Sequence, residues 1–137
     1  MEKEKTLITY GTFDLFHVGH LRLLKKIKER GTKLIVAVST DDFNLLKGKK
    51  TIIPFEQRLE VVSSIKYVDY AIRQEARRGT ENMKILGNVS CLIRGDDDEI
   101  SDEVEYIKSI GGEFIKILYT KGVSSSKIIS KINLRNN

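Results

Sequence analysis

The only two histidines of the sequence, His17 and His20, stand three residues apart around Gly19, shortly after the apolar run Leu7–Tyr10. If a helix begins here, residues at this spacing lie on one face of it. Their ring N–H groups then point to the place where the unpaired amides and the positive end of the helix dipole also point. Such an arrangement attracts phosphate, and Gly11 and Gly19 let the backbone approach an anion without side-chain obstruction. The pattern therefore predicts a phosphate site.

Two other interpretations of the histidine pair remain open. The pair could form half of a metal site, although zinc would then depend on carboxylates or on Cys91, because the chain has no further histidine. The rings could instead only cap the helix and pack against it. The glycines and the strand-to-helix context favour the phosphate site over both.

The elements around the histidine pair have the pattern of a β-α-β unit. Leu7–Tyr10 and Lys33–Val38 are apolar and rich in β-branched residues, which is typical of parallel strands buried on both faces. Between them, His20–Arg30 places Leu23, Leu24 and Ile27 on one helical face, with basic residues opposite. Gly31 is expected to end this helix as a C′ glycine.

The alternation of strands and helices continues to the end of the chain. We expect further strands at 67–72, 89–93 and 114–119, and further helices at 55–65, 80–86, 102–110 and 125–132. This order predicts an α/β fold, a single-domain open parallel sheet with helices on both faces, in which ligands bind beyond the carboxyl ends of the strands. The domain is expected to span residues 1–132, followed by a frayed tail at 133–137.

Composition limits the class of protein. The 137 residues include 24 Lys and Arg against 19 Asp and Glu, a net charge of +5, with 40% hydrophobic residues, which suits one folded domain. The single cysteine excludes an intramolecular disulfide. Acidic residues at the start, and no apolar run near the ~20 residues of a membrane span, lead us to expect a cytoplasmic protein. The scattered basic residues favour a small phosphorylated ligand over nucleic acid.

The stretch Gly11–His20 begins a longer series of motifs that follow one another along almost the whole chain. These are Ser39–Asn44, Lys47, Lys49, Arg58, Tyr67–Asp69, Gly95–Asp97 and Thr120–Ser126. In this order the sequence resembles the glycerol-3-phosphate cytidylyltransferase family of the HxGH nucleotidyltransferase superfamily. The resemblance implies a Rossmann-like nucleotidyltransferase fold.

The resemblance also implies a reaction, in which a phosphate monoester attacks the α-phosphorus of CTP in line and expels pyrophosphate. Because the second pKa of such a monoester is about 6, the nucleophile is already ionised at neutral pH, and the reaction needs hydrogen-bond donors rather than a general base. By the same resemblance His17, His20 and Lys49 are catalytic, with Lys49 on the leaving pyrophosphate. We expect Mg²⁺ to bridge the CTP phosphates, and we assign it no protein ligand.

The nucleotide is implied to contact ten residues, which are Gly11, Thr12, Phe13, Gly19, Lys47, Asp97, Thr120, Gly122, Ser124 and Ser125. Asp97 would accept a hydrogen bond from the exocyclic amine of cytosine, although adenine carries such an amine too. Ser124 and Ser125 would hold the outer phosphates at the start of the last helix, where they could equally form a helix cap.

The acceptor side departs from the family pattern. Tyr119, Asp98 and Lys66 stand where the family generally has arginine, tryptophan and arginine. Acceptor contacts are expected among Asp14, Arg58, Lys66, Arg77 and Tyr119, with loop support as the alternative role of Asp14 and a surface position as that of Arg58. Glycerol 3-phosphate is the leading acceptor, and another small polyol or amino-alcohol phosphate is its competitor.

Two other functions stay open. An adenylyltransferase of the same superfamily would use ATP: Ser124–Ser126 fits that group, whereas Leu15 stands where it usually has proline. A nucleotide-sensing domain without catalysis is the second alternative. The resemblance further implies a homodimer, and neither nucleic acid nor a membrane is an expected partner.

Overall fold

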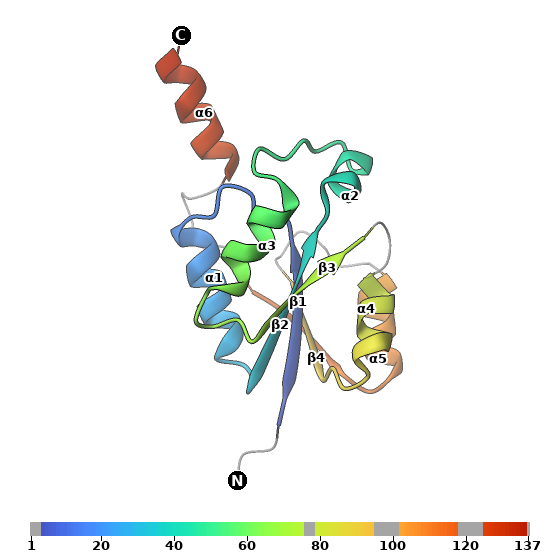
Figure 1. Cartoon of the computed structure of the whole chain (residues 1–137). Helices are drawn as coiled ribbons and strands as arrows, with labels where there is room; N and C mark the ends of the chain where they lie inside the picture. The colour runs from blue at the N-terminus through green and yellow to red at the C-terminus, as the bar shows by residue number, and fades with distance from the viewer. Residues whose placement is uncertain (1–3, 76–78, 95–101, 118–124, 137) are drawn as a thin grey trace.

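A five-stranded sheet forms the centre of the computed structural model, which describes residues 4–75, 79–94, 102–117 and 125–136 (Figure 1). The strands are β1 (Thr6–Gly11), β2 (Lys33–Ser39), β3 (Tyr70–Gln74), β4 (Cys91–Arg94) and β5 (Glu113–Lys116). Their spatial order is β3-β2-β1-β4-β5, and every neighbouring pair is parallel. The predicted open parallel sheet is confirmed.

β1 lies in the middle of the sheet, and both of its faces are covered. Leu7 and Ile8 are fully buried and belong to separate core clusters. In register, Ile8 stands beside Ile35 of β2 and Leu92 of β4. The chain continues from β1 outwards through β2 and β3, and then places β4 on the other side of β1. In open sheets of this kind ligands bind at the carboxyl edge beside such a reversal of strand order.

Helices cover the sheet on both faces, as predicted (Figure 1). On the face of Leu7 the core includes Leu24 and Val62, and on the face of Ile8 it includes Met83 and Ile107. The helices are α1 (Val18–Lys28), α2 (Asp41–Leu46), α3 (Phe55–Ser63), α4 (Gly79–Leu86), α5 (Asp102–Ser109) and α6 (Ser125–Asn136). The face of Leu7 is therefore covered by α1 and α3, and the face of Ile8 by α4 and α5.

α6 stands apart from the sheet (Figure 1). Its side chains from Ser130 to Arg135 are exposed, Leu134 by as much as 77%. The helix continues to Asn136, so helical structure extends beyond the predicted end at Ile132 into the segment predicted to fray. Among the described residues, no helix combines the length and the apolar character that a bilayer crossing requires.

The structure differs from the predicted elements at the start of β3 and at α2. β3 begins at Tyr70 instead of residue 67, because the Asp69 carboxylate accepts the Leu34 N–H (2.7 Å) and pairs with Lys28. These contacts hold residues 67–69 as a turn before the strand. α2 was not predicted, because it is a helix of only six residues. Its first turn is capped by Thr40 Oγ1, which accepts the Phe43 N–H (3.2 Å).

Gly31 is required for a close contact and not for a left-handed backbone. Its φ lies outside the left-handed region, so the predicted C′ glycine role is wrong. A Cβ at this position would lie 2.8 Å from Leu7 Cγ and 2.8 Å from the Lys5 carbonyl oxygen. The missing side chain therefore lets the turn after α1 pass directly over the start of β1.

We expect Gly31→Ala to lower the free energy of unfolding by about 1–3 kcal/mol, the usual cost of overpacking at a backbone contact. Arg30→Ala, one residue earlier and exposed, is the control and should change stability by no more than about 0.5 kcal/mol. Urea unfolding of the two variants measures the difference, and equal midpoints would show that the close contact is unimportant.

Candidate active site

The loop from Gly11 to His17 joins β1 to α1 at the carboxyl edge of the sheet. Phe13 and Leu15 both have a left-handed backbone, with φ of 55° and 48°. This conformation is uncommon for such side chains and is concentrated at functional sites. A Cβ on Gly11 would lie 2.7 Å from Phe13 Cε2, so Gly11 makes room for the Phe13 ring. That ring packs edge-on against His20, with ring centroids 5.4 Å apart, and so supports the histidine pair.

The two histidines cap the first turn of α1 reciprocally. His17 is the N-cap residue, and its Nδ1 accepts the Gly19 N–H (3.0 Å). His20 Nδ1 in turn accepts the His17 N–H (3.2 Å). The rings are stacked with their centroids 3.9 Å apart. Because each Nδ1 accepts a hydrogen bond, each neutral ring carries its proton on Nε2.

The histidine rings are neutral at physiological pH. Burial, with a smaller contribution from neighbouring His17, lowers the pKa of His20 to about 4, although Asp14 acts in the opposite direction. Burial also lowers the pKa of His17. Each ring therefore acts as an N–H donor without a formal charge, and it keeps that proton over the whole neutral range.

His17 Nε2 is buried and has no hydrogen-bond partner within the described residues. A buried donor without an acceptor is costly, and here it lies at a helix N-terminus, which favours anions. An oxygen of a bound phosphate would satisfy it. Helix capping and phosphate binding are thus compatible, since Nδ1 serves the cap and Nε2 stays available. The described residues contain no group of three or more His, Cys, Asp or Glu arranged as metal ligands.

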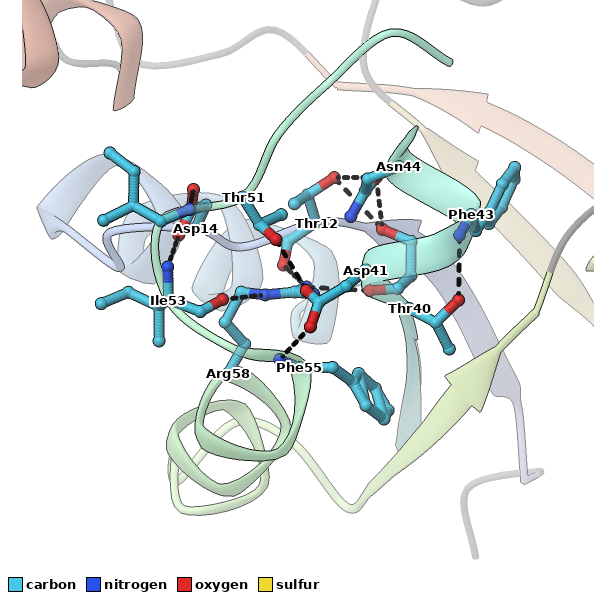
Figure 2. Close-up of polar contacts among 12 residues, drawn as sticks. Thr12, Asp14, Thr40, Asp41, Phe43, Asn44, Thr51, Ile53, Phe55 and Arg58 are labelled. Atoms are coloured by element: carbon cyan, nitrogen blue, oxygen red, sulfur yellow. Dashed lines mark hydrogen bonds and ion pairs between the residues drawn. The ribbon is translucent and has the colours of Figure 1, made fainter. Parts of the chain in front are cut away.

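A basic segment, residues 47–54, lies between α2 and α3 and is fastened to the loop that carries His17. Lys47 and Lys49 are exposed. The Lys49 N–H donates to the Asn44 carbonyl oxygen (2.8 Å) at the end of α2. Further along, the amides of Ile52 and Ile53 donate to the Asp14 carboxylate (2.8 and 2.9 Å). The structure thus brings the two predicted phosphate-binding segments together, as Figure 2 shows for Asp14 and Ile53.

Asp14 and Arg58 both bind groups of the protein itself, as expected for the loop-support role of Asp14, whose contact with the acceptor stays a prediction. The Asp14 carboxylate accepts three backbone N–H groups, two of them from the basic segment. Arg58 is only 1% exposed, so neither a surface position nor direct contact with an acceptor phosphate fits. Its guanidinium donates to three carbonyl oxygens and to the Asp41 carboxylate.

Asn44 is a buried residue of the site to which the sequence analysis gave no role. Its Oδ1 accepts hydrogen bonds from Thr12 Oγ1 and Ser39 Oγ (both 3.1 Å) (Figure 2). Its Nδ2 is buried without a partner among the described residues. The hydroxyl of Thr12, predicted to contact the nucleotide, therefore joins β1 to α2 in this structure. The only signal in the sequence was the position of Asn44 at the end of the motif Ser39–Asn44.

Lys66 lies at the opposite edge of the sheet. It follows α3, and it precedes Asp69, whose N–H donates to the Leu34 carbonyl oxygen near the start of β2 (2.9 Å). Its ammonium group stands 5.1 Å from the centre of the Tyr67 ring. The histidine pair lies at the carboxyl edge of the strands, so the expected acceptor contact of Lys66 does not fit a single chain.

Several predicted residues lie outside the described part of the chain. These are Asp97, Thr120, Gly122, Ser124, Arg77, Tyr119 and Asp98. Ser125 is described only as the first residue of α6. Their assignments remain predictions.

Fold and site together define the class: a Rossmann-like α/β domain in which a helix N-terminus carrying two histidines follows directly after the first strand. A family model described as cytidylyltransferase-like matches residues 8–131. The chain belongs to this cytidylyltransferase-like family, which confirms the predicted family and fold.

Similar proteins cover the same length of chain. A glycerol-3-phosphate cytidylyltransferase of Bacillus subtilis (strain 168) is 38% identical over 93% of this chain and 97% of its own. One from Staphylococcus aureus (strain NCTC 8325 / PS 47) is 40% identical over 90% and 92%. The crystal structure of the lipopolysaccharide core biosynthesis protein from Thermoplasma volcanium GSS1 matches with a TM-score of 0.73 and 25% identity, over 87% of this chain and all of that chain.

The titration of the two histidines can be measured without interference, since the chain has no others. Nitrogen-15 NMR should show both rings as the Nε2–H tautomer at pH 7, with the pKa of His20 near about 4. Because the folded pKa values are lowered, the unfolded chain binds more protons below its own pKa of about 6.5, so this contribution destabilises the fold as pH falls from about 6.5 towards 4. An ordinary His20 pKa or an Nδ1–H tautomer would contradict the capped geometry.

Proposed function

We propose that this protein transfers the cytidylyl group of CTP to glycerol 3-phosphate, forming CDP-glycerol and pyrophosphate. The observation that carries the proposal is the histidine pair, which presents Nε2–H donors at the N-terminus of α1 while Nδ1 is occupied by the cap. The names of the two bacterial relatives support this substrate pair.

The chemistry proceeds by one in-line displacement. A phosphate oxygen of glycerol 3-phosphate attacks the α-phosphorus, a new P–O bond forms, and the bond to the β-phosphate breaks, so that pyrophosphate leaves with the electron pair. The attacking phosphate is mostly dianionic at neutral pH, so no residue has to remove a proton. The task of the protein is to align two anions and to stabilise charge on the α-phosphoryl oxygens.

The neutral imidazoles suit this task. A donor that keeps its proton hydrogen-bonds to a developing negative charge without transferring that proton, and one preorganised donor is worth about 3–4 kcal/mol in such sites. Stacking of the rings and their hydrogen bonds to the backbone hold them in place before substrate binds. The proposal places Lys49 on the leaving pyrophosphate, with Lys47 beside it.

We include Mg²⁺ as the ion that accompanies CTP. In sites of this kind Mg²⁺ is commonly bound through the oxygens of the substrate phosphates. When bound, it would screen the charge of the triphosphate. A homodimer and a cytoplasmic location also belong to the proposal, as does base recognition by Asp97.

The first test is pyrophosphate release from four substrate combinations. CTP and ATP are each offered with glycerol 3-phosphate and with an amino-alcohol phosphate, in the presence of Mg²⁺. CTP with glycerol 3-phosphate should give the highest kcat/KM. Turnover with ATP would instead support the adenylyltransferase alternative, and binding of CTP without turnover would support the nucleotide sensor.

Variants of His17 can separate helix capping from catalysis. We expect His17→Ala and His20→Ala to lower kcat by at least about tenfold, through loss of a phosphoryl donor. His17→Asn is the sharper variant, because asparagine is a good N-cap residue but cannot present the distant N–H of Nε2. It should keep a near-native melting temperature and still lose activity.

Full activity of His17→Asn would mean that His17 serves only as a cap. Loss of activity together with unfolding in all three variants would leave no support for a donor role of the pair.

A further inference from the structure

A buried arginine joins the two halves of the phosphate site. Arg58 projects from α3, and its Nη1 donates to the carbonyl oxygens of Thr12 (2.7 Å), the residue after β1, and of Ser39 (2.9 Å), the last residue of β2. Its Nε donates to the carbonyl oxygen of Ile53 in the basic segment (2.9 Å). One guanidinium thus connects the loop before the histidines with the segment that carries the lysines (Figure 2).

Asp41 extends this connection. Its Oδ1 accepts from Arg58 Nη2 (2.7 Å) and from Thr51 Oγ1 (2.6 Å), and its Oδ2 accepts the Phe55 N–H (3.1 Å). The hydrogen bond from Thr51, followed by the bonds from Arg58 and Phe55, lowers the pKa of the Asp41 carboxyl although burial opposes the shift. The carboxylate is therefore ionised at neutral pH.

Asp14 completes the set from the other side. Its carboxylate accepts the N–H groups of Ile52 and Ile53 in the basic segment and of Leu15 in its own loop. Asp14, Asp41 and Arg58 thus bind polar groups of four residues, which are Thr51, Ile52, Ile53 and Phe55. We call these three side chains the clamp.

We propose that the clamp positions Lys49 for the phosphates of CTP, and that Arg58 is a positioning residue of the reaction. This inference rests on the proposed function, in which Lys49 meets the leaving pyrophosphate. The lysine side chains are long and exposed, so they reach a defined place only if the backbone beneath them is fixed. The clamp fixes that backbone, because its hydrogen bonds reach both the loop from Gly11 to His17 and the residues that follow Lys49.

The clamp predicts a kinetic pattern that differs from acceptor binding. Loosening the basic segment should weaken interactions with the CTP phosphates and leave those with glycerol 3-phosphate unchanged. A residue that binds the acceptor should do the reverse. A residue that matters only for folding should change neither KM in the folded fraction.

Three variants test the proposal. Arg58→Lys keeps a charge but loses the planar set of donors, and Thr51→Val removes one hydrogen bond to Asp41 with little change of shape. Val62→Ala is the matched control, because Val62 is fully buried on the same helix and its apolar side chain takes part in none of the hydrogen bonds of the clamp. All three are assayed well below their melting temperatures.

We expect the KM for CTP to rise at least about fivefold in Arg58→Lys and about twofold in Thr51→Val, with the KM for glycerol 3-phosphate within about twofold of wild type. Val62→Ala should lower the melting temperature and leave both KM values unchanged. A rise in the KM for glycerol 3-phosphate alone would assign Arg58 to the acceptor and overturn the proposal.

Limited trypsin digestion gives a second measurement that does not depend on turnover. Lys47, Lys49 and Lys50 lie in the basic segment just before the residues that the clamp binds, and cleavage at these lysines follows the opening of the segment. Mass spectrometry should show cleavage at these lysines accelerated at least about fivefold in Arg58→Lys and unchanged in Val62→Ala. Equal cleavage in wild type and Arg58→Lys would overturn the clamp even if the enzyme transfers cytidylyl groups. Faster cleavage in a protein that turns over no CTP would refute only the proposed function.

Discussion

The site depends on one constraint, which is that the first backbone N–H groups of α1 have no acceptors within the helix. A helix cannot bury its first N–H groups without acceptors, and here histidine side chains provide two of them through Nδ1. That choice determines the tautomer of each ring, because a neutral imidazole that accepts at one nitrogen donates at the other. The same bonds that cap the helix therefore leave Nε2 of each neutral ring as its N–H donor.

At the carboxyl edge of the sheet a second set of backbone groups needs hydrogen-bond partners. Strands stop there, and their last carbonyl groups lose their partners in the ladder. The planar guanidinium of Arg58 donates to the carbonyl oxygens of Thr12, just after β1, and of Ser39, at the end of β2. A buried guanidinium needs an anionic partner, and Asp41 supplies it while also binding the segment before α3. The irregular backbone around the site is thereby held by side chains instead of secondary structure.

Both sets of hydrogen bonds involve the loop from Gly11 to His17. Phe13 and Leu15 take left-handed conformations that side chains of their size rarely adopt. The Phe13 ring lies against His20. Asp14, which stands between Phe13 and Leu15 in the sequence, binds the basic segment. The left-handed conformations of Phe13 and Leu15 thus occur in a loop whose side chains contact both α1 and the basic segment. Such conformations are expected where contacts with the surrounding structure determine the backbone.

Much of the fold could be predicted from the sequence because it follows from local patterns. Continuous apolar runs at Leu7–Tyr10 and Lys33–Val38 indicated parallel strands, and the motif around His17 and His20 indicated the family. Only the tertiary structure decided the roles of Arg58, Asp14, Asn44 and Gly31. Their partners are distant in the sequence, up to 46 residues away for Arg58 and Thr12, and no local pattern of residue types distinguishes an exposed arginine from one that is buried among backbone carbonyl groups.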